Sequence, residues 1–273
     1  MSNAQEHLEK AIHIHPEFVD AHFELALILH DNGENEKSRE HLLKAIEIHP
    51  EFAQAHYHLA LLLKDMEDEK GSQKYFIKAI DLDNNCSDAY YHYGLLLADL
   101  EDYEEAKNNL KKAIDIDQNY SLAYYHLAKL LIDPEDYEEA KKNYFTAIDI
   151  DEDLSDAHYY LGKLLSGGLQ NNKDGVLVKK PEYENAIQHY KIAIRINKNY
   201  AKAHYNLALV YKIQKHYDLS RKHFEKAINI VNDYAKAHFH LAMLFKTAGK
   251  VFINKAIKPS ISAKKKTAGR NKN

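Results

Sequence analysis

Residues 45–65 read AIEIHPEFAQAHYHLALLLKD, and this stretch decides the fold. It contains the end of one predicted helix, a turn at Pro50, and a second helix with Leu59, Ala60 and Leu63 on one face. The leading Ala-Ile pair recurs every 34 residues and then after one longer step, at Ala11, Ala45, Ala79, Ala113, Ala147, Ala193 and Ala227. A fixed period of this size is typical of stacked repeats. The sequence therefore predicts an all-α chain made of copies of one unit.

The predicted repeats follow one register along the chain, with one insertion. They are 1–18, a lone second helix; 19–52, 53–86, 87–120 and 121–154, complete repeats; 155–200, a repeat with an inserted surface loop at about 166–182; 201–234, a complete repeat; 235–257, a partial repeat; and 258–273, a basic disordered tail. Asp102 and Asp136 predict helix starts, because an Asp side chain can accept hydrogen bonds from the first backbone N–H groups of a helix.

The core residues of these repeats follow a pattern with two parts. The first helix carries a pair such as Leu59-Ala60 and a large residue three positions later, and the second carries a small residue, a large residue and Ala. This pattern resembles the tetratricopeptide repeat (TPR) over nearly the whole chain. The resemblance implies a right-handed superhelical α-solenoid of stacked antiparallel helix pairs. The family's usual Trp early in the first helix is replaced by His22, His56, Tyr90, Tyr124, His158, His204 and His238.

The resemblance also implies a concave groove, lined by the first helices, that receives a peptide or a partner helix. The candidate groove residues are Tyr57, His58, Tyr91, His92, Tyr125, His126, Tyr159, Tyr160, Lys202, Tyr205, Asn206, Lys236, Phe239 and His240. Rings beside imidazoles could hold a segment through apolar contact and hydrogen bonds. The alternative is that the tyrosines pack against the neighbouring repeat. Lys202, Asn206 and Lys236 partly match the clamp with which some TPR proteins bind C-terminal carboxylates, but Tyr and Phe occupy its other positions.

The net charge of −4 is the sum of an acidic N-terminal part and a basic C-terminal part of the chain. Residues 1–165 contain 15 basic and 35 acidic side chains, whereas the remaining residues contain 22 and 6. In each of the first four complete repeats, the first helix is predicted to end at an aspartate, and these side chains could form an acidic rim. They are Asp31, Asp65, Asp99 and Asp133. Such asymmetry produces a field that steers charged partners. The opposite charges also suggest one possible function, which is self-association of the acidic end of one chain with the basic end of another.

Nucleic-acid or anionic-membrane binding is the main alternative to protein binding. It would use the basic C-terminal third, with phosphate contacts from Lys264, Lys265, Lys266, Arg270 and Lys272. The tail offers no aromatic residue on which a base could stack. The favoured prediction is therefore a protein-interaction scaffold.

No motif indicates an enzyme or a cofactor. The sequence shows no phosphate-binding Gly-rich loop, nucleophile elbow or metalloprotease helix. His56 and His58 point to opposite sides of a helix, so we expect no histidine metal site and interpret the first-helix histidines as core residues with a polar nitrogen at the rim. No apolar run is long enough to span a membrane, no signal peptide is visible, and Cys86 has no internal partner. These features favour the cytoplasm.

Overall fold

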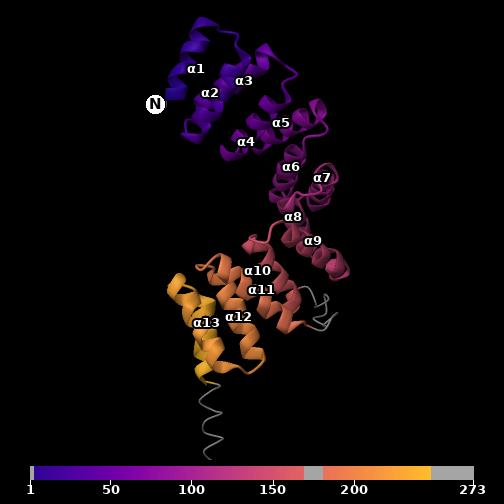
Figure 1. Cartoon of the computed structure of the whole chain (residues 1–273), viewed down its shortest axis with the longest axis vertical. Coiled ribbons are helices and arrows are strands. Elements are labelled where there is room, and N and C mark those ends of the chain that lie inside the picture. Colours follow the sequence, from indigo (N-terminus) through magenta and orange to yellow (C-terminus); the bar gives the residue numbers. More distant parts are fainter. Residues whose placement is uncertain (1–2, 169–180, 247–273) are drawn as a thin grey trace, which may run out of the picture. The chain divides into compact units, whose positions relative to one another are not determined.

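The computed structural model describes residues 3–168 and 181–246, in which helices are formed and no strand occurs (Figure 1). The chain divides into two compact units, an N-terminal unit of residues 1–131 and a C-terminal unit of residues 132–273. The N-terminal unit contains α1 (Asn3–Ile14), α2 (Val19–Asp31), α3 (Asn35–Ile48), α4 (Ala53–Asp65), α5 (Glu69–Leu82), α6 (Ser87–Asp99), α7 (Tyr103–Ile116) and α8 (Ser121–Leu130). The predicted all-α array of helix pairs is confirmed.

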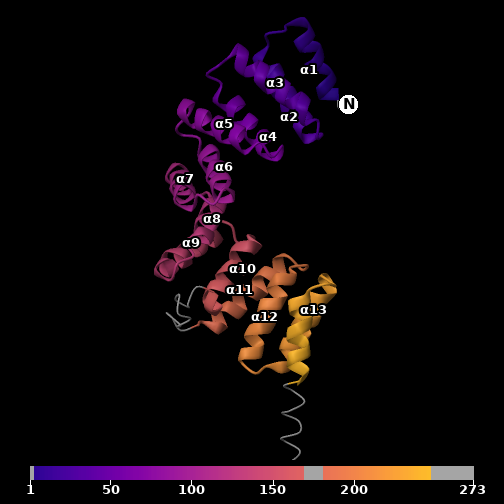
Figure 2. The same ribbon diagram turned by 180° about the vertical axis from the view of Figure 1, so that it is seen from behind.

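The C-terminal unit continues the alternation. It contains a 3-10 turn, η1 (Pro134–Asp136), then α9 (Tyr137–Ile150), α10 (Ser155–Lys163), a π-helical segment η2 (Leu164–Gly168), α11 (Tyr183–Ile196), α12 (Ala201–Ile213) and α13 (Tyr217–Ile230). Residues 235–246 are also helical. We call the even-numbered helices and residues 235–246 the A helices, and the odd-numbered ones the B helices. The two alternate along each unit in both views (Figure 2).

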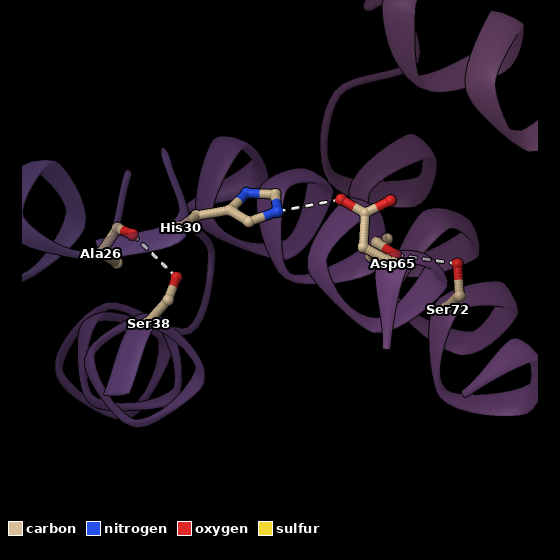
Figure 3. Close-up of polar contacts among 6 residues, drawn as sticks. Ala26, His30, Ser38, Asp65 and Ser72 are labelled. Atoms are coloured by element: carbon tan, nitrogen blue, oxygen red, sulfur yellow. Dashed lines mark hydrogen bonds and ion pairs between the residues drawn. The ribbon is translucent and has the colours of Figure 1, made fainter. Parts of the chain in front are cut away.

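Small residues hold each A helix close to the following B helix. Ala60 of α4 is fully buried, and Ser72 of α5 donates a hydrogen bond from its Oγ to the Ala60 carbonyl over 2.8 Å (Figure 3). The same bond joins Ser38 to Ala26 over 2.7 Å. A buried hydroxyl needs such a partner, and only a side chain this small leaves the backbones near enough to form it.

A residue in the left-handed conformation ends four of the A helices. The φ angles are 78° for Gly33, 61° for Glu67, 63° for Glu101 and 65° for Lys215. The next residue then bonds back into the A helix, as when the Asp102 N–H donates to the Leu97 carbonyl over 2.9 Å. This is the usual way to satisfy the last carbonyls of a helix, and it favours glycine.

Replacing Glu101 with Gly should therefore stabilise the protein. We expect Glu101→Gly to raise the free energy of unfolding by about 0.5–1 kcal/mol, because glycine adopts a positive φ without a steric cost. Chemical denaturation of the variant and the wild type measures the difference. Glu135→Gly is the matched control, because Glu135 lies in the η1 turn without a positive φ and should give no gain.

One predicted A helix ends early. The sequence predicted a helix up to Asp133, but α8 ends at Leu130. Pro134 explains the difference: it occupies the position of Leu100, whose N–H donates to the Leu96 carbonyl over 3.0 Å, and proline has no N–H.

Both predicted helix starts are confirmed, because α7 begins directly after Asp102 and α9 directly after Asp136. Asp102 accepts a hydrogen bond from the Glu105 N–H over 3.4 Å, as expected. The expected bond is missing at Asp136, whose side chain accepts none from the first turn of α9. The local reason is that Asp136 is in the right-handed helical region, as the last residue of the η1 turn, rather than in the more extended conformation of Asp102.

Replacing Pro134 with Leu should extend α8. With an N–H restored at this position, we expect the backbone amides of residues 131–133 to become protected from hydrogen exchange. Amide exchange followed by NMR or mass spectrometry would show this, with Leu100→Ala as a control that keeps its N–H. Unchanged exchange rates at residues 131–133 would contradict the role assigned to Pro134.

Parts of the predictions lie outside the described residues. These are the middle of the predicted loop, residues 169–180, and the second helix of the last repeat with the basic tail, residues 247–273. Within the described ranges, no helix has both the length and the apolar character needed to cross a membrane.

Candidate functional site

The A helices carry a row of rings that runs from one repeat to the next. In the N-terminal unit the ring centroids are 5.3 Å apart for Phe23 and His58, 6.0 Å for Tyr57 and His92, and 5.7 Å for Tyr91 and His126. In the C-terminal unit they are 5.9 Å apart for Tyr205 and His240, and the Asn206 amide donates to the Tyr159 hydroxyl over 3.0 Å. The predicted groove residues are thus brought together within each unit as one row, which we call the A-helix row.

Several aromatic members of the row are covered by their neighbours. Tyr91 and Tyr125 are each 5% exposed and Tyr159 is 7% exposed. The Tyr91 ring lies 4.8 Å from that of Tyr120, whose hydroxyl donates to Asp88 over 2.6 Å. These rings pack between repeats, so their contact with a partner stays a prediction.

The other members of the row reach the surface. Half-buried side chains are Tyr57, His58, His92, His126, Tyr160, Tyr205, Asn206 and His240, and exposed ones are Lys202, Lys236 and Phe239. The polar groups therefore face solvent on a support of covered aromatic rings. This arrangement can offer hydrogen bonds and apolar contact at the same place.

Burial keeps the row uncharged in the N-terminal unit. It lowers the pKa of His58 and His92, so both imidazoles are neutral at pH 7. It also raises the pKa of Tyr57, and that of Tyr91 to about 12. A neutral imidazole has one donor and one acceptor nitrogen, so this part of the row is suited to polar groups rather than to ions.

Two carboxylates of the predicted acidic rim have basic partners on the preceding A helix. Asp65 points toward His30 (Figure 3), and His30 Nε2 lies 2.9 Å from Asp65 Oδ2. Lys64 Nζ lies 2.9 Å from Asp99 Oδ2. These pairs join successive A helices and offset the cost of a carboxylate at the C-terminal end of a helix. Asp133 lies beyond the end of α8 and is not part of the rim.

Cations replace these pairs in the C-terminal unit. Lys212 Nζ lies 3.5 Å from His240 Nδ1, and the Lys163 ammonium lies 5.8 Å from the centre of the Tyr160 ring. Lysines also contact the row in the N-terminal unit, where Lys129 lies 5.5 Å from the centre of the Tyr125 ring.

Buried histidine pairs join the A and B helices, and sequence reasoning missed them. The two Nδ1 atoms are 2.9 Å apart in His22 and His41, 3.0 Å in His158 and His189, and 2.9 Å in His204 and His223. His22, His56, His158 and His204 are buried as predicted, whereas His238 is exposed and the prediction is wrong there. In the three pairs, Nδ1 of the first-helix histidine faces a second imidazole rather than the rim. A sequence signal existed, because two of the pairs share a spacing of 19 residues.

The geometry places one proton of the first pair. His22 Nε2 lies 2.9 Å from the carbonyl oxygen of Pro16, which can only accept, so this nitrogen donates. Between the two Nδ1 atoms of His22 and His41, one nitrogen donates and the other accepts. His56 has a similar bond to Pro50 but stacks on Tyr75, and its buried Nδ1 has no hydrogen-bond partner.

The pairs should make stability depend on pH. Burial lowers the pKa of His41, and lowers those of His189 and His223 to about 4, below the ordinary value of about 6.5. The unfolded chain therefore binds protons that the folded chain does not, and stability falls as the pH drops from about 6.5 towards 4.

Denaturation of the wild type at pH 7 and pH 5.5 measures this loss. His223→Tyr should reduce it, because Tyr75 shows that tyrosine fits at the equivalent place and the ordinary pKa of a tyrosine side chain is about 10. An equal loss in the variant would show that other groups cause it.

Among residues 3–168 and 181–246, no three His, Cys, Asp or Glu side chains are placed so that they could hold a metal ion.

Family models for one kind of repeat match most of the chain. A model described as TPR repeat matches residues 26–66 and 176–215, and three described as tetratricopeptide repeat match residues 53–86, 87–120 and 122–154, residues 201–234, and residues 7–40. The chain belongs to the tetratricopeptide repeat family.

Solved TPR structures are similar to this chain. YrrB, described as a TPR protein with an unusual peptide-binding site, has a TM-score of 0.58 and 23% identity over 73% of this chain and 96% of its own. The structure of Pseudomonas aeruginosa pilF has a TM-score of 0.70 and 21% identity over 82% of this chain and 97% of its own. The APC/C Cut9–Hcn1 hetero-tetramer has a TM-score of 0.68 and 17% identity over 89% and 46%. At these identities the likeness shows the fold alone. No curated protein matches the chain.

Proposed function

We propose that this TPR chain is a non-catalytic scaffold that binds a peptide or helix of a partner protein along the A-helix row. The observation that carries the proposal is the row itself, in which half-buried imidazole and amide groups lie beside covered aromatic rings. The description of YrrB as a peptide-binding TPR protein supports this class of ligand. The cytoplasmic setting that we propose rests on the single cysteine, Cys86.

A stripe of leucines gives the N-terminal unit an apolar surface beside the row. Leu61 and Leu95 are half-buried and follow His58 and His92 by three residues, so they lie on the same side of their helices. A partner segment could place apolar side chains on the leucines and polar groups on the imidazoles. Burial of the apolar side chains would provide most of the affinity, and the hydrogen bonds would fix the orientation.

Removing two imidazoles should weaken such binding. Peptides selected from a random phage-displayed library on the wild type would be tested by fluorescence anisotropy against the double variant His58→Ala/His92→Ala. We expect affinity to fall by about tenfold or more. The control is Asn108→Ala/Lys112→Ala, which changes exposed residues of the B helix α7 and should leave binding unchanged.

Thermal unfolding of both variants shows whether the fold is kept. Equal affinity of the selected peptides for the wild type and the imidazole variant would contradict the proposal. A salt titration separates it from the nucleic-acid alternative, because affinity based on phosphate contacts falls steeply as salt is raised. The residues assigned to that alternative, from Lys264 to Lys272, lie outside the described part of the chain.

A further inference from the structure

A cavity of about 480 Å³ opens at the start of α12 in the C-terminal unit. Its lining residues are Asp156, Tyr200, Ala201, Lys202, Val231 and Tyr234. The volume lies in the range of about 300–1,000 Å³ that is usual for ligand pockets. Only Lys202 of this lining was among the candidate groove residues. We call this cavity the Val231 pocket.

The two aromatic side chains of the pocket are held in place from behind. The Tyr200 ring lies 4.9 Å from the ring of Tyr159, and the Tyr234 ring lies 5.1 Å from that of Tyr205. The Tyr200 hydroxyl donates a hydrogen bond to the Asp156 carboxylate. Because both supporting rings belong to the A-helix row, the pocket is continuous with the proposed binding surface and its walls are ordered before a ligand arrives.

Val231 departs from a local rule that the four preceding repeats follow. At the equivalent position these repeats have an Asx turn, in which the side-chain oxygen accepts from the N–H two residues later, at 3.0 Å for Asp83, 2.9 Å for Asp117, 3.0 Å for Asp151 and 3.1 Å for Asn197. The first two repeats have a polar residue there as well, His15 and His49. Valine cannot accept this bond, and its side chain is 40% exposed. An apolar residue that gives up a turn hydrogen bond and remains in solvent indicates a functional site.

The charge around the pocket indicates the kind of partner. Lys202 is exposed at its edge, and Lys236 is exposed at the same position of the next repeat. Residues 181–246 contain 11 basic and 5 acidic side chains, so the net charge of this stretch is positive and attracts negative charge. The Asp156 carboxylate in the lining already accepts from the Tyr200 hydroxyl. An acidic segment would therefore be steered to this part of the row.

We propose that the Val231 pocket receives a bulky apolar side chain from an acidic segment of a partner protein, with Lys202 and Lys236 pairing with carboxylates next to it. This rests on the proposed function and adds the chemistry of the partner in the C-terminal unit. The apolar side chain lies between the Tyr200 and Tyr234 rings and covers Val231. Its burial provides affinity, and the two ammonium groups select against basic segments.

The test uses a defined peptide and a variant that other repeats show to be compatible with the fold. The probe is a fluorescein-labelled nonapeptide of Asp and Glu around a central Phe, with comparison peptides that carry a central Ala or have Lys in place of the acidic residues. The variant is Val231→Asn, which keeps the charge and places a polar residue where Asn197 forms its Asx turn. The control is Leu219→Asn, at a residue of α13 that is 43% exposed and does not line the pocket.

In fluorescence anisotropy we expect the wild type and Leu219→Asn to bind the Phe peptide about tenfold more tightly than the Ala peptide. Val231→Asn should lose this preference while its melting temperature stays the same or rises. Lys202→Ala/Lys236→Ala should weaken both acidic peptides, and the Lys-containing peptide should bind no variant.

Three results would overturn the proposal. These are equal binding of the Phe and Ala peptides by the wild type, an unchanged preference in Val231→Asn, and no binding of the Phe peptide by the wild type. If labelled oligothymidine bound instead and lost affinity in Val231→Asn, the pocket would stack nucleic-acid bases. None of these results decides the proposed function, which is tested separately with library peptides and the His58→Ala/His92→Ala variant.

Discussion

The close contact between a small residue on each A helix and a small residue on the next B helix sets the spacing of the repeats. A Cβ added to Gly94 of α6 would lie only 3.2 Å from the carbonyl oxygen of Ala106 in α7. Large residues such as Phe76, which is fully buried, fill the remaining space. Helices held this closely have little freedom to shift, so each repeat presents the same edge to the next one.

The A-helix row follows from this regular spacing. An aromatic ring of one repeat meets the residue 35 positions later, as Phe23 meets His58, because neighbouring A helices lie in nearly the same register. The surface is therefore built by repetition. Its specific features arise where the repetition is broken, as by Val231, which replaces an Asx-turn residue, and by Pro134, which ends α8 early.

The histidine pairs show how a polar residue can occupy a position that is usually apolar. His22 is 5% exposed and yet both of its nitrogens have partners, the backbone of Pro16 and the side chain of His41. A satisfied buried pair costs little, whereas a buried nitrogen without a partner, as in His56, has a real penalty. The pairs also link the packing of three repeats to the protonation state of their cores.

The sequence by itself determined the period, the helix pairs, the family and the residues of the row. These features depend on spacings of three, four and 34 residues, and the spacings are clear because they recur in every repeat. Even the early end of α8 had a local signal in Pro134, which the repeat pattern outweighed. The helix start after Asp136 was predicted correctly, but the expected hydrogen bond from its side chain is missing, since the altered turn changed the backbone around it.

Only the tertiary structure decided which members of the row are covered. The exposure of Tyr91 depends on Tyr120, which is distant along the chain and directly precedes α8. The same holds for His41 beside His22, which lie on different helices of one repeat, and for the Val231 pocket, whose walls come from two repeats. Burial is set by what lies across a helix interface, and the pattern along one helix does not contain that information.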